Sequence, residues 1–90
     1  MDTRVVMISI VVENQEHIEK LNKILHEYRP YIIGRMGIPY PKRGISLISV
    51  TVDAPADKIS AMTGKIGMLE GITSKALYAR LQEGSGEKVD

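Results

Sequence analysis

Six segments of the chain carry regular patterns of apolar residues. Residues 4–12 (RVVMISIVV) are almost all apolar or β-branched, which predicts a strand buried on both faces. Further strands are expected at residues 31–39, 45–52 and 72–81. The segment 31–39 is interrupted by Gly34 and Gly37, a composition suited to a bulge or to the close approach of another backbone.

Two helices are expected between these strands. The first follows Asn14, a plausible N-cap, and ends before Pro30. The second is expected to be capped by Asp53 or a neighbour, to hold Pro55 in its first turn and to stop at Gly71. Its apolar stripe recurs at helical spacing and consists of Ile59, Met62, Ile66 and Leu69.

The resulting element order defines the fold class. Strand-helix-strand-strand-helix-strand is the α+β, ferredoxin-like βαββαβ sandwich, in which both helices cover one face of a four-stranded antiparallel sheet. The expected spatial order of the strands is 4-1-3-2. Residues 1–81 are predicted to form this single domain, and residues 82–90, rich in Gly, Ser and charge, a flexible C-terminal tail.

One face of such a sheet is left without helices. Val6, Ile8, Ile10 and Val12 are expected on the helix side of the first strand. The opposite face then carries an uncharged patch, with candidate interface residues Val5, Met7, Ser9, Val11, Leu47 and Ser49. Such patches mark interaction surfaces, so we expect a homo-oligomer, either a dimer or a tetramer.

Composition narrows the classes of partner. The 90 residues include no Cys, which removes disulfides, thiolate metal sites and thiol nucleophiles and fits a cytoplasmic location. The net charge is +1 with scattered basic residues, so direct nucleic-acid binding is not predicted. The longest apolar run, residues 5–8, is too short for a membrane span, and no secretory signal is recognised.

The sequence offers no recognised catalytic motif, metal site or cofactor site. His17 and His26 are nine residues apart and are expected on opposite faces of the first helix, as solvated or rim residues. A metal shared by these histidines across an oligomer interface remains the alternative.

Glycines mark two unusual places. Gly64 and Gly67 fall inside the second helix, where each costs about 1 kcal/mol relative to Ala. Close packing against the sheet or the other helix is the favoured interpretation, and backbone approach by a ligand or a second subunit is the alternative. Arg35, between Gly34 and Gly37, either binds a small anion or belongs to a bulge that suits an oligomer, and the second interpretation is favoured.

Three segments carry a family resemblance: residues 4–13 (RVVMISIVVE), 35–39 (RMGIP) and 59–72 (ISAMTGKIGMLEGI). They resemble the small proteins described as regulators of the iron-only hydrogenase system. These proteins have an ACT-like fold similar to the C-terminal domain of nickel-responsive repressors. The resemblance covers about residues 4–80, and its most specific mark is the pattern Ser/Thr-Gly-Lys-Ile/Leu-Gly-x-Leu-x-Gly-Val/Ile at residues 63–72.

This resemblance implies a regulatory protein, not an enzyme. ACT-like domains bind small effectors at subunit interfaces, near the loop that corresponds to residues 12–15. Together with the glycine segments, the candidate ligand-binding residues are Glu13, Asn14, Gln15, Arg35, Gly37, Gly64 and Gly67. The loop lacks the glycine common in amino-acid-binding ACT domains, which argues against an amino-acid ligand. Nickel sensing is not carried over, because Cys and a matching His pair are absent.

Three functions follow as hypotheses. The leading one is a stand-alone ACT-like regulatory module that oligomerises and binds a small effector between subunits. Any transcriptional effect is expected to pass through a protein partner, since 90 residues leave no room for a DNA-binding domain. The alternatives are a ligand-free interaction subunit and a small enzyme whose intersubunit active site would use Arg35, Arg80, His17 and Tyr40.

Overall fold

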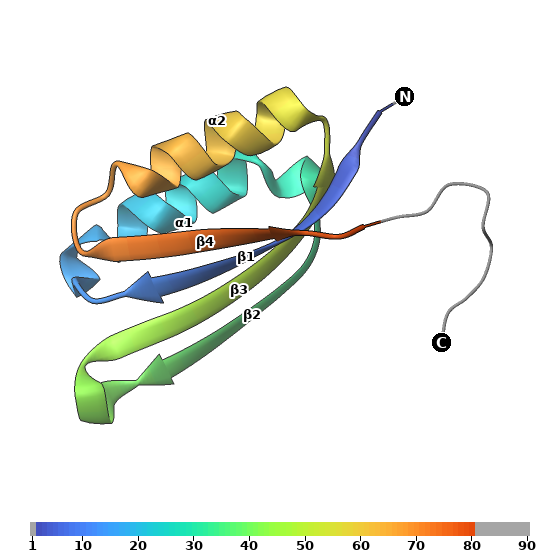
Figure 1. The fold of residues 1–90 in the computed structure, drawn as a ribbon. Coiled ribbons are helices and arrows are strands. Elements are labelled where there is room, and N and C mark those ends of the chain that lie inside the picture. The colour runs from blue at the N-terminus through green and yellow to red at the C-terminus, as the bar shows by residue number, and fades with distance from the viewer. Residues whose placement is uncertain (1, 81–90) are drawn as a thin grey trace, which may run out of the picture.

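A computed structural model describes residues 2–80 of the chain, so the tail predicted at 82–90 lies outside the described residues. In chain order the elements are β1 (Arg4–Val12), η1 (Gln15–His17), α1 (Ile18–Glu27), η2 (Arg29–Tyr31), β2 (Ile32–Tyr40), η3 (Pro41–Arg43), β3 (Ile45–Ala54), α2 (Ala56–Gly67) and β4 (Ile72–Tyr78). Both α-helices lie on the same face of the sheet (Figure 1).

The four strands form one antiparallel sheet in the order β2-β3-β1-β4. This is the predicted order 4-1-3-2 read from the other edge, and it confirms the ferredoxin-like, ACT-like fold. The central strand β1 places Met7 opposite Thr51 of β3 and Leu77 of β4. Paired residues point to the same side of an antiparallel sheet, so this register defines which residues share each face.

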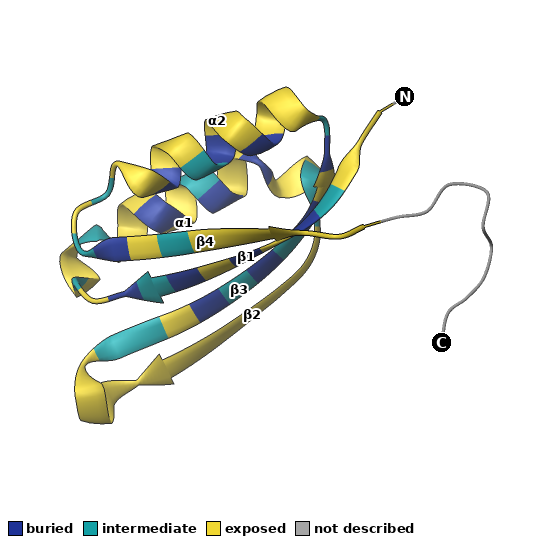
Figure 2. Cartoon of the chain, viewed as in Figure 1, coloured by how far each residue is buried: buried dark blue, intermediate teal, exposed yellow. Residues whose placement is uncertain are grey.

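The core lies between the sheet and the helices. Val6, Ile8, Ile10 and Val12 are at most 1% exposed. Opposite them the helices contribute the buried residues Leu21, Leu25, Ile59, Met62 and Ile66. The prediction that β1 is buried on both faces is wrong for the single chain, because Met7 is 47% exposed and Ser9 is also exposed (Figure 2). Packing in the core of a single chain therefore does not explain the apolar residues on the second face of β1.

Strand β2 is the exposed edge of the sheet. All its residues except Ile32 are exposed (Figure 2), and the β2–β3 hairpin extends beyond the layer of helices (Figure 1). The register with β3 shifts between Ile32 and Gly34, which confirms the bulge suggested by the glycines. Pro39 is accommodated because an edge strand does not need every N–H for the ladder.

The ends of the helices differ in part from the prediction. The Oδ1 atom of Asn14 accepts a hydrogen bond from the Glu16 amide at 2.9 Å, so Asn14 caps the first turn as expected. Helix α2, in contrast, has Pro55 as its N-cap, without a side-chain cap. Asp53 cannot cap it, because Asp53 belongs to β3 and pairs with Val5.

Helix α2 ends at Gly67, not at Gly71. Gly71 lies in the turn before β4, where its φ of 77° is left-handed and favours glycine. Helix α2 therefore ends before Gly71, and Gly71 belongs to the turn that leads into β4. Strand β4 likewise ends at Tyr78, before the predicted limit at Leu81.

Candidate functional site

The predicted ligand-binding residues lie in three separate parts of the fold. Glu13, Asn14 and Gln15 are in or next to the loop after β1, and Arg35 and Gly37 are on the edge strand β2. The remaining two, Gly64 and Gly67, are exposed on α2.

The loop after β1 is closed by the turn before β4. The amides of Glu13 and Asn14 donate to the Gly71 carbonyl at 2.7 and 3.2 Å. The Nδ1 atom of His17 lies 2.7 Å from the Glu70 carbonyl. A carbonyl oxygen only accepts, so His17 donates through Nδ1–H. These backbone groups hold two loops of the chain together.

A groove runs between α1 and the uncovered β2–β3 hairpin. Its first part has a volume of about 300 Å³ and is lined by Ile18, Asn22, Arg35, Gly37, Ile38, Pro39, Ser46 and Ile48. Its second part, of about 320 Å³, is lined by Gln15, Pro39, Tyr40, Pro41, Gly44, Ile45 and Ser46. Pro39 and Ser46 line both parts, so the two are adjacent, and we call them together the hairpin groove.

The hairpin groove has a cationic end and apolar walls. The Nη2 atom of Arg35 donates to the Oδ1 atom of Asn22 at 2.8 Å, which joins β2 to α1. Within residues 2–80 the ion pair recorded is Lys65–Glu27, so Arg35 has no carboxylate within 4.0 Å in this part of the chain. The groove thus unites Arg35 and Gly37 at one end with Gln15 at the other, but not with Glu13 or Asn14.

The face of the sheet away from the helices is the second candidate site, and we call it the open sheet face. All the predicted interface residues lie on this face by register: Val5, Met7, Ser9 and Val11 in β1, and Leu47 and Ser49 in β3. Five large apolar side chains on this face are 38% to 68% exposed: Met7, Met36, Ile38, Leu47 and Leu77.

The open sheet face has a shallow apolar hollow of about 160 Å³, lined by Ser9, Ile10, Val11, Met36, Ile38, Leu47, Ile48 and Ser49. Charged residues of the described strands are sparse on this face. Lys75 lies opposite Ser9, and Asp53 lies opposite Val5 near the end of the strand. The middle row of the face by register is Met36, Ser49, Ser9 and Lys75, with Met7 and Leu77 on one side of it and Ile38, Leu47 and Val11 on the other.

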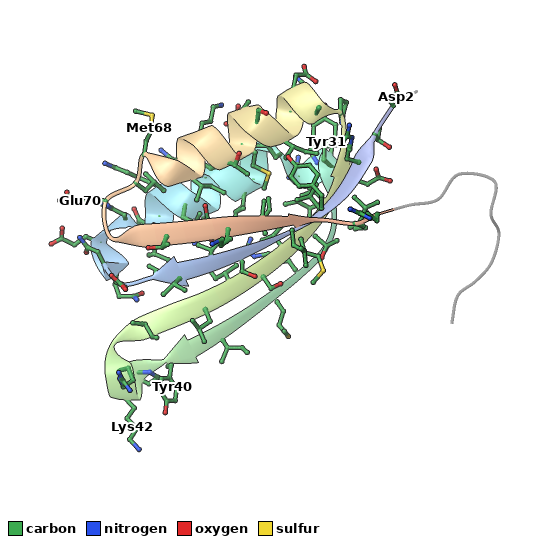
Figure 3. The ribbon with its side chains drawn as sticks, in the orientation of Figure 1. Asp2, Tyr31, Tyr40, Lys42, Met68 and Glu70 are labelled. Carbon is green, nitrogen blue, oxygen red and sulfur yellow. The ribbon has the colours of Figure 1, made fainter. Side chains whose placement is uncertain are left out.

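The outer surface of α2 holds the two glycines of the family pattern. A Cβ atom at Gly64 or Gly67 would meet nothing within 4 Å, so the predicted close packing against the sheet or α1 is wrong. The neighbouring Met68 is 85% exposed, and its side chain points away from the body of the fold (Figure 3).

Lys65, between these glycines, bridges the two helices. Its Nζ atom donates to Glu27 Oε2 at 2.8 Å and lies 5.1 Å from the centroid of the Tyr28 ring. The hydrogen bond to Glu27 holds the pKa of Lys65 above its ordinary value, and Tyr28 acts in the same direction. Lys65 thus contributes to the contact of α2 with α1.

The four residues of the enzyme alternative are not all brought together within one chain, because Arg35 and Tyr40 line the two parts of the hairpin groove whereas His17 and Arg80 line neither. His17 contacts the carbonyl of Glu70, just before β4, whereas Arg80 follows the opposite end of β4. Arg35 contacts Asn22.

The structure also bears on metal binding and on the membrane. The Nη1 atom of Arg29 lies 3.3 Å from the Nε2 atom of His26. Across residues 2–80, no three His, Cys, Asp or Glu residues are grouped as a metal site would require. The same part of the chain has no helix of the length and apolarity needed to cross a membrane.

Comparison with solved structures places the fold among known proteins. Protein TM1266 from Thermotoga maritima superposes with a TM-score of 0.84 at 25% identity, covering 88% of this chain and 100% of that chain. A formyltetrahydrofolate deformylase from Pseudomonas putida KT2440 gives 0.55 at 15% identity, over 84% of this chain and 28% of that chain. The designed protein Foldit4 gives 0.58 at 14% identity, over 90% and 100%. The last two show the fold alone, since one fold hosts unrelated functions.

A family model gives the more specific assignment. No curated protein matches the chain significantly. Residues 4–76, however, match the model of the TM1266-like family, described as "Iron-only hydrogenase system regulator, putative". The match includes β1, the Arg35 segment and all of α2. This chain therefore belongs to the TM1266-like family of iron-only hydrogenase system regulators.

Proposed function

We propose that this chain is a stand-alone regulatory module of an iron-only hydrogenase system that works as a homo-oligomer and binds a small effector. The family supports the regulatory, non-catalytic role, and the open sheet face is the observation that supports assembly. The module would act in the cytoplasm, and any effect on transcription would pass through a protein partner.

The composition of the open sheet face supports burial against another surface. Burying a Leu, Ile or Met side chain is favourable by about 1.5–3 kcal/mol relative to leaving it exposed. On this face Met36 is 59% exposed and Leu77 is 68% exposed, on opposite edges of the sheet. Apolar area therefore spans all four strands and is not confined to one side chain.

The size of the open sheet face fits a second copy of the chain. Strands lie about 4.8 Å apart and rise about 3.4 Å per residue, so four strands over the paired length of β1 and β4 present roughly 450 Å² in projection. Side-chain relief makes the accessible area larger than the projection. A standard interface buries about 800 Å² per partner, so this face forms most of one.

We place the effector in the hairpin groove, because Arg35, Gly37 and Gln15 line it. Glu13 and Asn14 instead use their amides to bind Gly71. The groove borders the exposed edge strand β2, which also contributes Met36 and Ile38 to the open sheet face. Assembly through that face would therefore place the effector site beside the subunit interface.

Native mass spectrometry and light scattering on the full chain test the assembly. Met7→Glu adds a charge at the centre of the open sheet face and should convert the oligomer to a monomer. Met68→Glu, on the exposed end of α2, is the matched control and should leave the mass unchanged. Circular dichroism checks that both variants fold. A wild-type chain that is monomeric at tens of micromolar, or a Met7→Glu variant that keeps the oligomeric mass, would contradict the proposal.

A further inference from the structure

We propose that the hairpin groove binds a small aliphatic carboxylate, held at its charged end by Arg35 and Asn22. This inference rests on the proposed regulatory function, since the carboxylate would be the effector of the module. It concerns the first part of the groove, between α1 and the middle of β2.

The polar end of the groove presents donors. The hydrogen bond from Arg35 Nη2 to Asn22 Oδ1, at 2.8 Å, uses one of the five N–H donors of the guanidinium. It also occupies the amide oxygen of Asn22, so the Asn22 amide nitrogen remains as a donor. Ser46 adds a hydroxyl to the same part of the groove. The planar fork of a guanidinium matches the two oxygens of a carboxylate.

The groove discriminates between classes of ligand. None of the residues lining this part is Asp or Glu, so the ammonium group of an amino acid would lack an acidic partner. An anion, in contrast, would neutralise Arg35, which has no carboxylate within 4.0 Å among residues 2–80. The charge pattern therefore favours a simple carboxylate over an amino acid.

The remaining walls of the groove are apolar and favour a ligand with an apolar body. Ile18, Pro39 and Ile48 line the space beside Arg35, whereas Ile38, which also borders it, turns its side chain to the open sheet face. Gly37 leaves this part of the groove open, because a Cβ there would meet nothing within 4 Å. The volume of about 300 Å³ is at the lower end for small-molecule sites, which suits an acid of a few carbon atoms. Inorganic phosphate or sulfate would use the same donors but leave the isoleucines exposed to water.

Titration of the ¹⁵N-labelled full chain with sodium isovalerate, followed by NMR, tests the proposal. Saturable shifts are expected at the Arg35 Nε and Asn22 Nδ2 signals and at the Gly37 amide. The neutral isostere isovaleramide should bind at least about tenfold more weakly, as expected when a charge-assisted hydrogen bond is lost. Sodium sulfate should also bind more weakly, because it cannot cover the apolar wall.

Three variants assign the binding to these residues. Arg35→Met retains much of the apolar stem but not the charge and should abolish saturable binding, and Arg35→Lys should weaken it by loss of the planar fork. Gly37→Val should block the groove without removing the charge. Arg43→Met, at the hairpin tip and outside the groove lining, is the control and should bind as wild type does. Intact backbone spectra show that each variant folds.

The outcomes separate this inference from the proposed assembly. Absence of saturable shifts at tens of millimolar isovalerate, or equal binding of isovaleramide or sulfate, overturns the carboxylate site even if the chain is oligomeric. Binding that survives Arg35→Met also overturns it. A monomeric chain that binds isovalerate through Arg35 overturns the assembly and leaves the carboxylate site standing.

Discussion

The main-chain carbonyl of Gly71 accepts a hydrogen bond from the amide of Asn14 at 3.2 Å, which joins the turn before β4 to the loop after β1. The two residues are in such close contact that a Cβ atom at Gly71 would collide with the Cβ atom of Asn14 and press on its backbone. The φ of Gly71 is 77°, a conformation that L side chains rarely adopt.

Gly71→Ala is expected to destabilise the fold by at least about 2 kcal/mol, because left-handed strain and overpacking act together. Urea denaturation followed by circular dichroism measures the change. Gly44→Ala is the matched control, since Gly44 also has a positive φ, of 67°, but open space around it. It should cost only about 1 kcal/mol. Equal losses in the two variants would show that the contact with Asn14 does not matter.

The pKa of Lys65 leads to a prediction at alkaline pH. A raised folded-state pKa means that the protonated lysine stabilises the fold, fully at pH values below the ordinary pKa of 10.5 and less as pH rises through the folded value. Lys65→Met should therefore lower the melting temperature slightly near pH 8, and the difference from wild type should shrink as pH rises above the ordinary lysine value. Both side chains are about half exposed, so high salt should reduce the same difference. A difference that is constant across pH would exclude the ion pair as its cause.

Leu21 offers a test of the core. It is fully buried between α1 and the sheet, so Leu21→Ala should cost about 2–5 kcal/mol through lost burial and a cavity. Met68→Ala removes a side chain that is 85% exposed and should change the stability by less than about 0.5 kcal/mol. Chemical denaturation of both variants makes the comparison. A small effect at Leu21 would contradict the packing described.

The fold could be predicted from the sequence because its signals are local. The nearly continuous apolar run of residues 4–12 predicts a strand, and the helical spacing of Ile59, Met62 and Ile66 specifies which side of the second helix is buried. The end of α2 could not be predicted in the same way. Gly71 suggests a helix stop, but its contact with Asn14 is tertiary and holds it in a later turn.

The candidate site could be predicted only in part. Arg35 and Gly37 stand out in the sequence, whereas Asn22 and Ser46 join them through tertiary structure alone. The sequence alone does not assign Met36 and Ile38 to the open sheet face, because the bulge at Ile33 changes the alternation of the strand. Before it Ile32 pairs with the buried Val52, and after it Gly34 pairs with Thr51 on the other face. A one-residue insertion in the ladder reverses the face of every residue that follows.

Gly64 provides a test of what surrounds α2. It lies in the middle of the helix, where Gly is about 0.5–1 kcal/mol less favourable than Ala, and a Cβ there would meet nothing within 4 Å. Gly64→Ala should therefore stabilise the chain by this amount, as measured by urea denaturation at a concentration where the oligomeric mass is known. If instead the variant loses stability or oligomeric mass, another molecule must pack against this glycine. In that case the family pattern around Lys65 would mark a second interface, because a single chain gives Gly64 no contact that alanine would disturb.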